Sequence, residues 1–195
     1  MLYTLFLFFS SWICADFLSG LYHWVQDRYM SPDSRFRWVS LVASDNEQHH
    51  AKPTQMTIKP YLETVAYSLM AAAPVLLLMF LLLEPGPFKQ FAMLTIGFLA
   101  SANMVHRLAH TPASKLPDWV VWLQSTGFFL PPDQHEMHHR SWATRKLVDK
   151  EQARHRYCAM SGWVNPVLDQ VRFFDHLESF LLTFGIAPLP ATPDS

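Results

Sequence analysis

One run of apolar residues constrains the fold of this chain more than any other feature. Val65 to Leu83 is 19 residues long and carries no charge. As an α-helix this run is about 28 Å long, which matches the hydrocarbon core of a bilayer. The run therefore predicts a membrane-spanning helix.

Other apolar runs extend this prediction along the chain. The N-terminal run lacks the basic start and the cleavage site of a signal peptide, so a retained helix is favoured. A shorter run, Trp119 to Pro132, is 14 residues long and too short to span the membrane. It is expected to lie in the interface or to form a re-entrant segment. The fold class is therefore an all-α integral membrane protein with about three transmembrane helices plus an interfacial or re-entrant helix. We expect one domain, residues 1–195, with spans at about 2–26, 62–83 and 90–110, an interfacial segment at 117–131 and a C-terminal cytosolic segment at 140–195.

The basic residues predict the orientation in the membrane. The loop Glu84–Gln90 carries only Lys89, whereas the other 14 lysines and arginines lie on the opposite side or at its boundary. The positive-inside rule makes that side the cytosol, and all ten histidines lie on it. The net charge of −1 gives no reason to expect a nucleic-acid partner. A bacterial inner membrane is expected because no presequence precedes the first helix, although a processed organellar protein would look the same.

The most concentrated chemistry lies at His135-Glu136-Met137-His138-His139. Histidines three and four residues apart share one face of a helix and can bind one metal. Alone, the segment matches the H-E-x-x-H pattern of zinc proteases, with His135 and His139 as ligands and Glu136 as the general base. An intramembrane zinc metalloprotease is therefore an alternative function.

Further histidines make a single zinc site a poor explanation. His106 and His110 lie four apart with Asn103 on the same face, and His49-His50 lies in a segment that reads as a polar loop. Asp16, His23 and Asp27 share one face of the first helix. One zinc takes four ligands, so eight histidines suit two metal ions better. With only two cysteines in the chain, histidine and carboxylate must hold the metal, which favours a pair of non-haem irons.

Such a centre at the membrane surface indicates oxidation of lipid. Iron activates dioxygen, and the oxidant can remove hydrogen from unactivated C–H bonds of alkyl and acyl chains. We predict a membrane lipid oxidase or desaturase. An aspartate such as Asp16 inside a membrane helix usually marks a functional site or a paired charge, and a local cap or pair is the less favoured alternative. We expect Asp16 and Asn103 to hold imidazole tautomers from outside the ligand set.

Five motifs occur in a specific order along almost the whole chain, about Asp16 to Pro188. They are D-x-x-S-G-x-x-H-W-x-x-D at Asp16–Asp27, His49-His50 with Pro53 and Thr57, N-x-x-H-x-x-x-H at Asn103–His110, H-x-x-H-H at His135–His139 and Y-C-x-x-S-G-W-x-N at Tyr157–Asn165. In these the chain resembles the Kua family of lipid desaturases, which includes CarF-like plasmanylethanolamine desaturases and the plastid phosphatidylglycerol trans-desaturase.

The resemblance implies a di-iron enzyme that uses O2 and two electrons to remove two hydrogens from a lipid chain near its head group. The product would be a vinyl ether phospholipid in the plasmalogen branch, which is favoured, and a trans double bond in an acyl chain in the plastid branch. The electrons would come from a carrier such as a ferredoxin or cytochrome b5. The resemblance leaves open whether Asp27 binds iron itself or orients a residue that does. The implied iron ligands are His23, His49, His50, His106, His110, His135, His138 and His139, with Asp27 as a further candidate.

Two histidines stay outside this set. His155 lies in a stretch between His139 and Tyr157 that is longer and more charged than expected for the family, and we expect it at the surface. His176 lies in the short amphipathic helix predicted at Phe173–Phe184, also at the surface. A non-catalytic metal-binding membrane protein is the remaining alternative class.

Overall fold

A computed structural model describes residues 1–143 and 155–189, and within these ranges the chain forms helices and no strand. The all-helical prediction is therefore confirmed for the described part of the chain. The charged stretch at 144–154 and the tail at 190–195 lie outside the described residues, as does part of the segment expected to be cytosolic.

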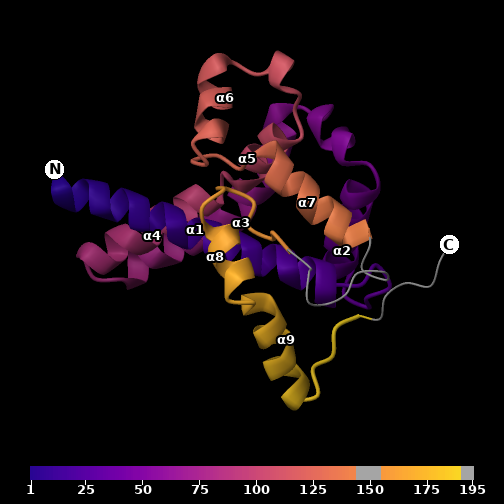
Figure 1. Cartoon of the computed structure of the whole chain (residues 1–195). Helices are drawn as coiled ribbons and strands as arrows, with labels where there is room; N and C mark the ends of the chain where they lie inside the picture. Colours follow the sequence, from indigo (N-terminus) through magenta and orange to yellow (C-terminus); the bar gives the residue numbers. More distant parts are fainter. Residues whose placement is uncertain (144–154, 190–195) are drawn as a thin grey trace.

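The apolar runs form the long helices of the structure (Figure 1). Helix α1 (Leu2–Tyr29) packs against α4 (Pro87–Leu99), and α4 packs against α3 (Tyr61–Leu82). Helices α1 and α3 are each long and apolar enough to cross a membrane. The third expected span is two helices, α4 and α5 (Ala102–Ala109), which meet at 40° and can count as one broken span.

The break between α4 and α5 has a local cause. The hydroxyl and the backbone N–H of Ser101 both donate to the carbonyl of Phe98, at 2.6 and 2.8 Å. Serine hydrogen bonds of this kind compete with the regular helical ladder. The chain therefore turns at Ser101, and α5 starts in a new direction with His106 on its buried face.

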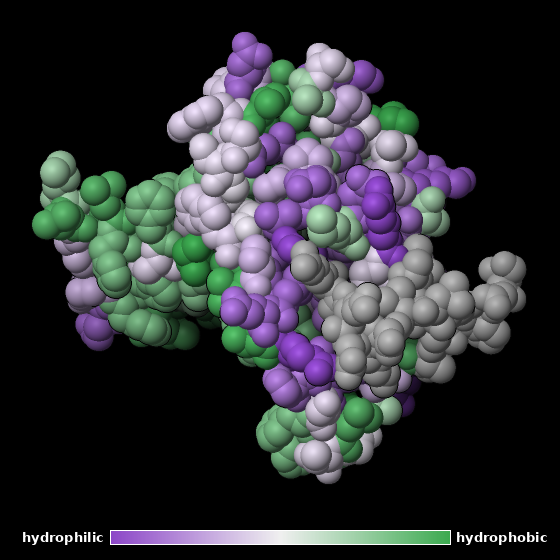
Figure 2. Space-filling model, in the orientation of Figure 1, coloured by the Kyte–Doolittle hydropathy of each residue, from purple (hydrophilic) through white to green (hydrophobic). Residues whose placement is uncertain are grey.

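Hydropathy divides the surface into two regions (Figure 2). In this view the lobe around α1 and α4, at the left, is covered by apolar residues, the central and upper parts are mostly hydrophilic, and the lower end over α9 is again apolar. Large apolar side chains such as Phe6, Leu81 and Phe88 are more than half exposed on this lobe. Exposed apolar surface of this extent is what a lipid-facing bundle presents.

Short helices surround the polar end of α1. The segment read as a polar loop instead forms helix α2 (Arg37–Ala51), so that His49 and His50 lie on a helix. It has little apolar periodicity of its own, and its contacts with α1, α7 (Pro132–Ala143) and the 3₁₀ turn η1 (Pro53–Thr57) support it. The remaining elements are η2 (Ala113–Lys115), α6 (Asp118–Ser125), α8 (Val164–Gln170) and α9 (Phe173–Thr183).

Two apolar clusters fix these helices on α1. Trp12 of α1 stacks on Phe128, with ring centroids 4.6 Å apart, and packs with Leu130 and Met160. In the second cluster, Trp24, near the polar end of α1, packs with Tyr157 and Phe174. The two clusters hold the segment around residues 157–162 along one side of α1, from its middle to its polar end.

Candidate metal centre

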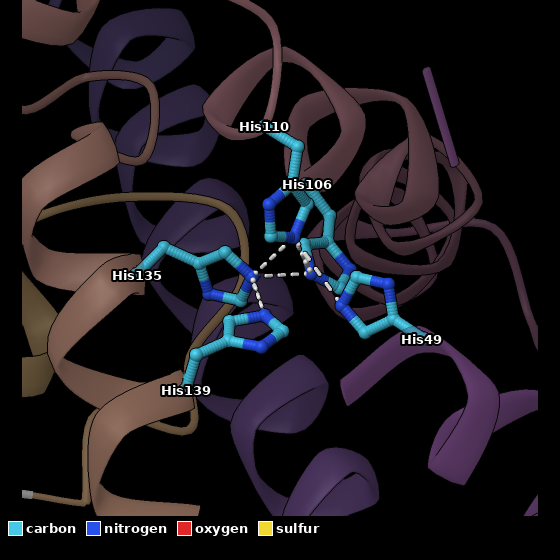
Figure 3. Close-up of side chains that lie close together, drawn as sticks. All are labelled: His49, His106, His110, His135 and His139. Atoms are coloured by element: carbon cyan, nitrogen blue, oxygen red, sulfur yellow. Dashed lines mark hydrogen bonds between the residues drawn. The ribbon is translucent and has the colours of Figure 1, made fainter. Parts of the chain in front are cut away.

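Five histidines from three helices form the first group. The ligand atoms that these residues offer all lie within 4.8 Å of one another. Their rings point toward a common centre (Figure 3). The group, hereafter the five-histidine pocket, consists of His49 on α2, His106 on α5, His110 at the end of α5, and His135 and His139 on α7.

The nitrogen atoms in this pocket crowd together more closely than hydrogen bonds alone can explain. The Nε2 of His135 lies 2.6 Å from that of His106, 2.8 Å from that of His110 and 3.0 Å from that of His139. A neutral imidazole carries one N–H, so a single proton on His135 cannot bond to three nitrogens. Nitrogens bound about 2.1 Å from one ion would lie about 3.0 to 3.4 Å apart. The separation from His139 reaches this range, whereas those from His106 and His110 are shorter, so these rings would move apart slightly around an ion. The donor set therefore suits a metal ion better than a hydrogen-bond network.

A second group contains the only carboxylate of the centre within the described residues. It consists of His23, Asp27, His50 and His138, all four of them buried, and we call it the four-residue pocket. Asp27 Oδ1 lies 3.1 Å from His50 Nε2 and 3.9 Å from His23 Nε2, and Asp27 Oδ2 lies 3.5 Å from His138 Nε2. One carboxylate facing three imidazole nitrogens is a suitable ligand set for a divalent cation.

The two pockets are adjacent. The rings of His50 and His139 lie 4.7 Å apart between centroids, and those of His23 and His106 lie 5.8 Å apart. All nine residues that the sequence singled out as metal ligands therefore lie in one of two neighbouring groups. Their role as ligands stays a prediction, which this geometry supports.

Burial keeps several imidazoles of these pockets in the form that binds metal. Burial, and then the neighbouring histidines, lower the pKa of His49 and of His135 far below the usual 6.5. The same causes lower the pKa of His139 to about 3. Burial and His23 lower the pKa of His138, against the opposing effect of Asp27. Neutral imidazoles at neutral pH leave nitrogen lone pairs for a metal.

Among the described residues, neither Asp16 nor Asn103 has an imidazole as its hydrogen-bond partner, so neither holds an imidazole tautomer by direct contact. Asp16 accepts hydrogen bonds from the backbone N–H groups of Met160 and Ser161, at 2.9 and 3.0 Å, and from the Ser161 hydroxyl at 2.6 Å. Asn103 donates from Nδ2 to Ser68 Oγ at 2.8 Å.

Sequence reasoning missed the groups that hold two imidazoles from behind. His23 Nδ1 lies 3.1 Å from the carbonyl oxygen of Tyr157, and His138 Nδ1 lies 2.7 Å from that of His155. Backbone carbonyls leave no mark in a sequence. Asn46, which donates to Asp27 Oδ1 at 2.7 Å, was also missed, and its place four residues before His50 was the available indication.

The remaining histidines lie outside both pockets. The side chain of His155 is partly buried, not fully at the surface as expected, and its Nε2 lies 3.0 Å from Asp175 Oδ1. His176 is exposed, as predicted. Glu136, the base of a zinc protease, is 61% exposed and accepts a hydrogen bond from Arg140 outside the pockets.

Similarity to curated proteins covers most of the chain. It is 29% identical over 187 residues to a plasmanylethanolamine desaturase of Myxococcus xanthus, covering 94% of this chain and 62% of that protein. It is 28% identical to "Fatty acid desaturase 4-like 2, chloroplastic" of Arabidopsis thaliana, covering 92% of this chain and 61% of the relative. It is 29% identical to plasmanylethanolamine desaturase 1 of Mus musculus, covering 87% and 61%. The chain thus spans about three fifths of the length of these relatives.

No solved structure matches the chain significantly. The lipid desaturase domain matches residues 12–189, which include both pockets and the segment that supports them. The resemblance inferred from the five motifs is therefore confirmed. This chain belongs to the lipid desaturase domain family.

Proposed function

We propose that this protein is an O2-dependent lipid desaturase in which the two adjacent pockets each hold one iron ion. The double bond would be introduced near the head-group end of a phospholipid alkyl or acyl chain. The observation that carries the proposal is the grouping of nine ligand side chains into two neighbouring pockets in a chain of a lipid desaturase family.

Iron fits the chemistry of the donors. Both pockets offer neutral imidazoles, one of them adds a carboxylate, and neither includes a thiolate. Imidazole and carboxylate together suit non-haem iron. Two iron ions bound here would supply the activation of dioxygen that an unreactive C–H bond needs.

The reaction balances with an external reductant. Two adjacent methylene groups of the lipid chain each lose one hydrogen and become a carbon–carbon double bond. Dioxygen is reduced to two molecules of water, using those two hydrogens together with two electrons and two protons. A ferredoxin or cytochrome b5-type carrier is the proposed source of the electrons.

The membrane placement follows from the helices. We propose an integral, multi-pass protein with α1, α3 and the broken α4–α5 pair as spans, and residues 1–195 as one domain. The pockets lie at the polar ends of α1 and α5, so the metal centre would be at the level of the lipid head groups. By the positive-inside rule this is the cytosolic face, and a bacterial inner membrane is the proposed location. Helix α6 is too short to span and would lie in the interface.

The proposed substrate is an ether phospholipid. Conversion of a plasmanyl to a plasmenyl (vinyl ether) lipid is favoured because two of the relatives above carry the name of that activity. Trans desaturation of a phospholipid acyl chain comes next, in line with the chloroplast relative. Both reactions act near the head group, where the proposed metal centre would lie.

The zinc protease is not favoured. That function needs Glu136 beside the metal, yet Glu136 points to solvent and pairs with Arg140. A single zinc would also leave one of the two pockets without a purpose.

Lipid analysis tests the proposal. The full chain would be expressed in cells that contain plasmanyl lipids but no vinyl ethers, with a His135→Ala variant as the inactive control. We expect vinyl ether or trans-unsaturated phospholipids with the wild-type chain, only under aeration. If neither lipid class changes, the proposed activity is wrong, and a non-catalytic metal-binding role is the better account.

A further inference from the structure

The loop formed by residues 155–161 lies behind two imidazoles of the four-residue pocket. Two of its backbone carbonyls, of His155 and Tyr157, face the Nδ1 atoms of His138 and His23 at 2.7 and 3.1 Å. A carbonyl oxygen can only accept a hydrogen bond, so each Nδ1 must carry the proton. This fixes the tautomer of both rings and leaves the Nε2 lone pairs directed at the four-residue pocket.

The five-histidine pocket has no such support at two of its rings. The Nδ1 atoms of His135 and His139 are buried and have no hydrogen-bond partner among the described residues. In the four-residue pocket His50 Nδ1 is also without a partner among these residues, so the pockets differ in that the loop carbonyls face His23 and His138 only. A change in the loop should affect one pocket and spare the other.

The loop is fastened to α1 by a buried carboxylate. Asp16 is fully buried and accepts three hydrogen bonds from the loop, two from the backbone N–H groups of Met160 and Ser161 and one from the Ser161 hydroxyl. Ser19, one helical turn further along α1, accepts from the N–H of Ala159 at 3.0 Å. Hydrogen bonds to a buried carboxylate are strong, and leaving that carboxylate without them is costly.

Close packing fixes the same loop at the next turn of α1. A Cβ added to Gly20 would lie 2.6 Å from Cys158 Sγ and 3.0 Å from the backbone nitrogen of Cys158. On its other side, Asn165 accepts from the N–H of Cys158 and donates to its carbonyl, both at 2.9 Å. The loop thus has one position along α1, one helical turn before His23.

We propose that Asp16 is a positioning residue for the four-residue pocket, acting through the loop 155–161 to hold His23 and His138 in their metal-binding tautomer and orientation. Asp16 touches neither the imidazoles nor the metal. Its effect passes along the loop from Met160 and Ser161 to the carbonyls of Tyr157 and His155. The inference rests on the proposed two-metal centre. Within that centre, the loop supports the four-residue pocket and not the five-histidine pocket.

The test is a Co²⁺ titration of the metal-free full chain in detergent, followed by absorption spectroscopy and by metal bound per chain. His138→Ala and His49→Ala provide reference titrations in which the four-residue or the five-histidine pocket is impaired. For Asp16→Asn we expect one of two binding steps to weaken by about 10- to 100-fold, the usual effect of losing an outer partner of a ligand. The other step should be unchanged, so that the titration resembles that of His138→Ala.

Asn103→Ala is the matched control. Asn103 is also a polar residue of a predicted membrane helix, but its hydrogen bond is to Ser68, so both binding steps should remain as in the wild type. Gly20→Ala displaces the loop while Asp16 is kept, and it should weaken the same step as Asp16→Asn. If Asp16→Asn does not fold, Ser161→Ala takes its place with a smaller loss in that step. It removes the hydroxyl that donates to Asp16 and accepts from the N–H of Trp163, but it keeps both backbone N–H groups that bond to Asp16.

The outcomes separate the two claims. If the wild type binds two Co²⁺ ions and Asp16→Asn binds both as tightly, the positioning role is wrong. It is also wrong if both steps weaken equally, or if the titration resembles that of His49→Ala. If the wild type itself binds fewer than two ions, the proposed two-metal centre fails instead.

Discussion

At the scale of single residues, neighbouring histidines serve different pockets. His49 and His139 point into the five-histidine pocket, whereas His50 and His138 point into the four-residue pocket. A step of one residue turns a helix by about 100°, so adjacent side chains diverge, while residues four apart converge. The two His-His pairs therefore connect the two pockets, because each pair contributes one imidazole to either pocket.

Replacing His110 tests the five-histidine pocket directly. His110→Ala removes a ligand whose Nε2 lies 2.8 Å from that of His135. We expect lipid desaturation in cells to fall below detection, because the five-histidine pocket would lose one of its proposed ligands. A zinc site built on His135 and His139 alone would not need His110. His176→Ala, an exposed histidine outside both pockets, should retain wild-type desaturation. Normal product formation by His110→Ala would contradict the assignment.

At this scale the sequence predicted which side chains lie together but not the groups that support them. The spacings of His106 with His110 and of His135 with His139 indicate convergence because helix geometry fixes it locally. The partner of Asp16 is Ser161, 145 residues away, and no local pattern encodes such a pairing. The carbonyls of His155 and Tyr157 belong to the backbone, so no side chain could indicate them.

At the scale of elements, the short helices carry the ligands and the long ones carry the apolar surface. The long helices follow from uncharged runs, and for this reason they were predicted closely. Helix α2 was missed because its contacts with α1 and α7 stabilise it more than its own sequence pattern does. The break at Ser101 was missed because one serine inside an apolar run does not mark a turn by itself.

A tight turn after α6 connects that helix to the loop that supports the metal centre. Gly127 has φ +76°, and a Cβ there would lie 2.8 Å from Trp163 Nε1. Its carbonyl accepts the N–H of Gly162 at 2.8 Å. We expect Gly127→Ala to destabilise the protein by about 1–3 kcal/mol, through backbone strain and displacement of Trp163.

Thermal unfolding in detergent measures this effect. Gly86→Ala is the matched control, since Gly86 has an extended backbone and a Cβ there would meet nothing within 4 Å. Its melting temperature should match that of the wild type. Equal melting temperatures for Gly127→Ala and Gly86→Ala would show that the turn does not need glycine.

At the scale of the whole molecule, the buried imidazoles make stability depend on pH. Burial and neighbouring histidines lower the pKa of His139 from 6.5 to about 3, and burial also lowers that of His135. Below about pH 6.5 the unfolded chain therefore binds protons that the folded chain does not. Stability rises with pH where the unfolded state binds more protons, so acid destabilises the metal-free protein.

Melting of the metal-free protein at two pH values checks this sign. We expect a lower melting temperature at pH 5.5 than at pH 7.5. Metal added at pH 7.5 should raise it, because an ion that binds only the folded state stabilises that state. An unchanged or higher melting temperature at pH 5.5 would mean that the histidines are not held neutral by folding.

The metal content of the purified full chain tests the two-metal centre most directly. Elemental analysis of protein made in iron-supplemented cells would give the number of iron and zinc atoms per chain. The nine ligands in two adjacent pockets predict about two irons per chain and little zinc. One zinc per chain with little iron would contradict the centre described here and would return His135, Glu136 and His139 to the zinc protease interpretation.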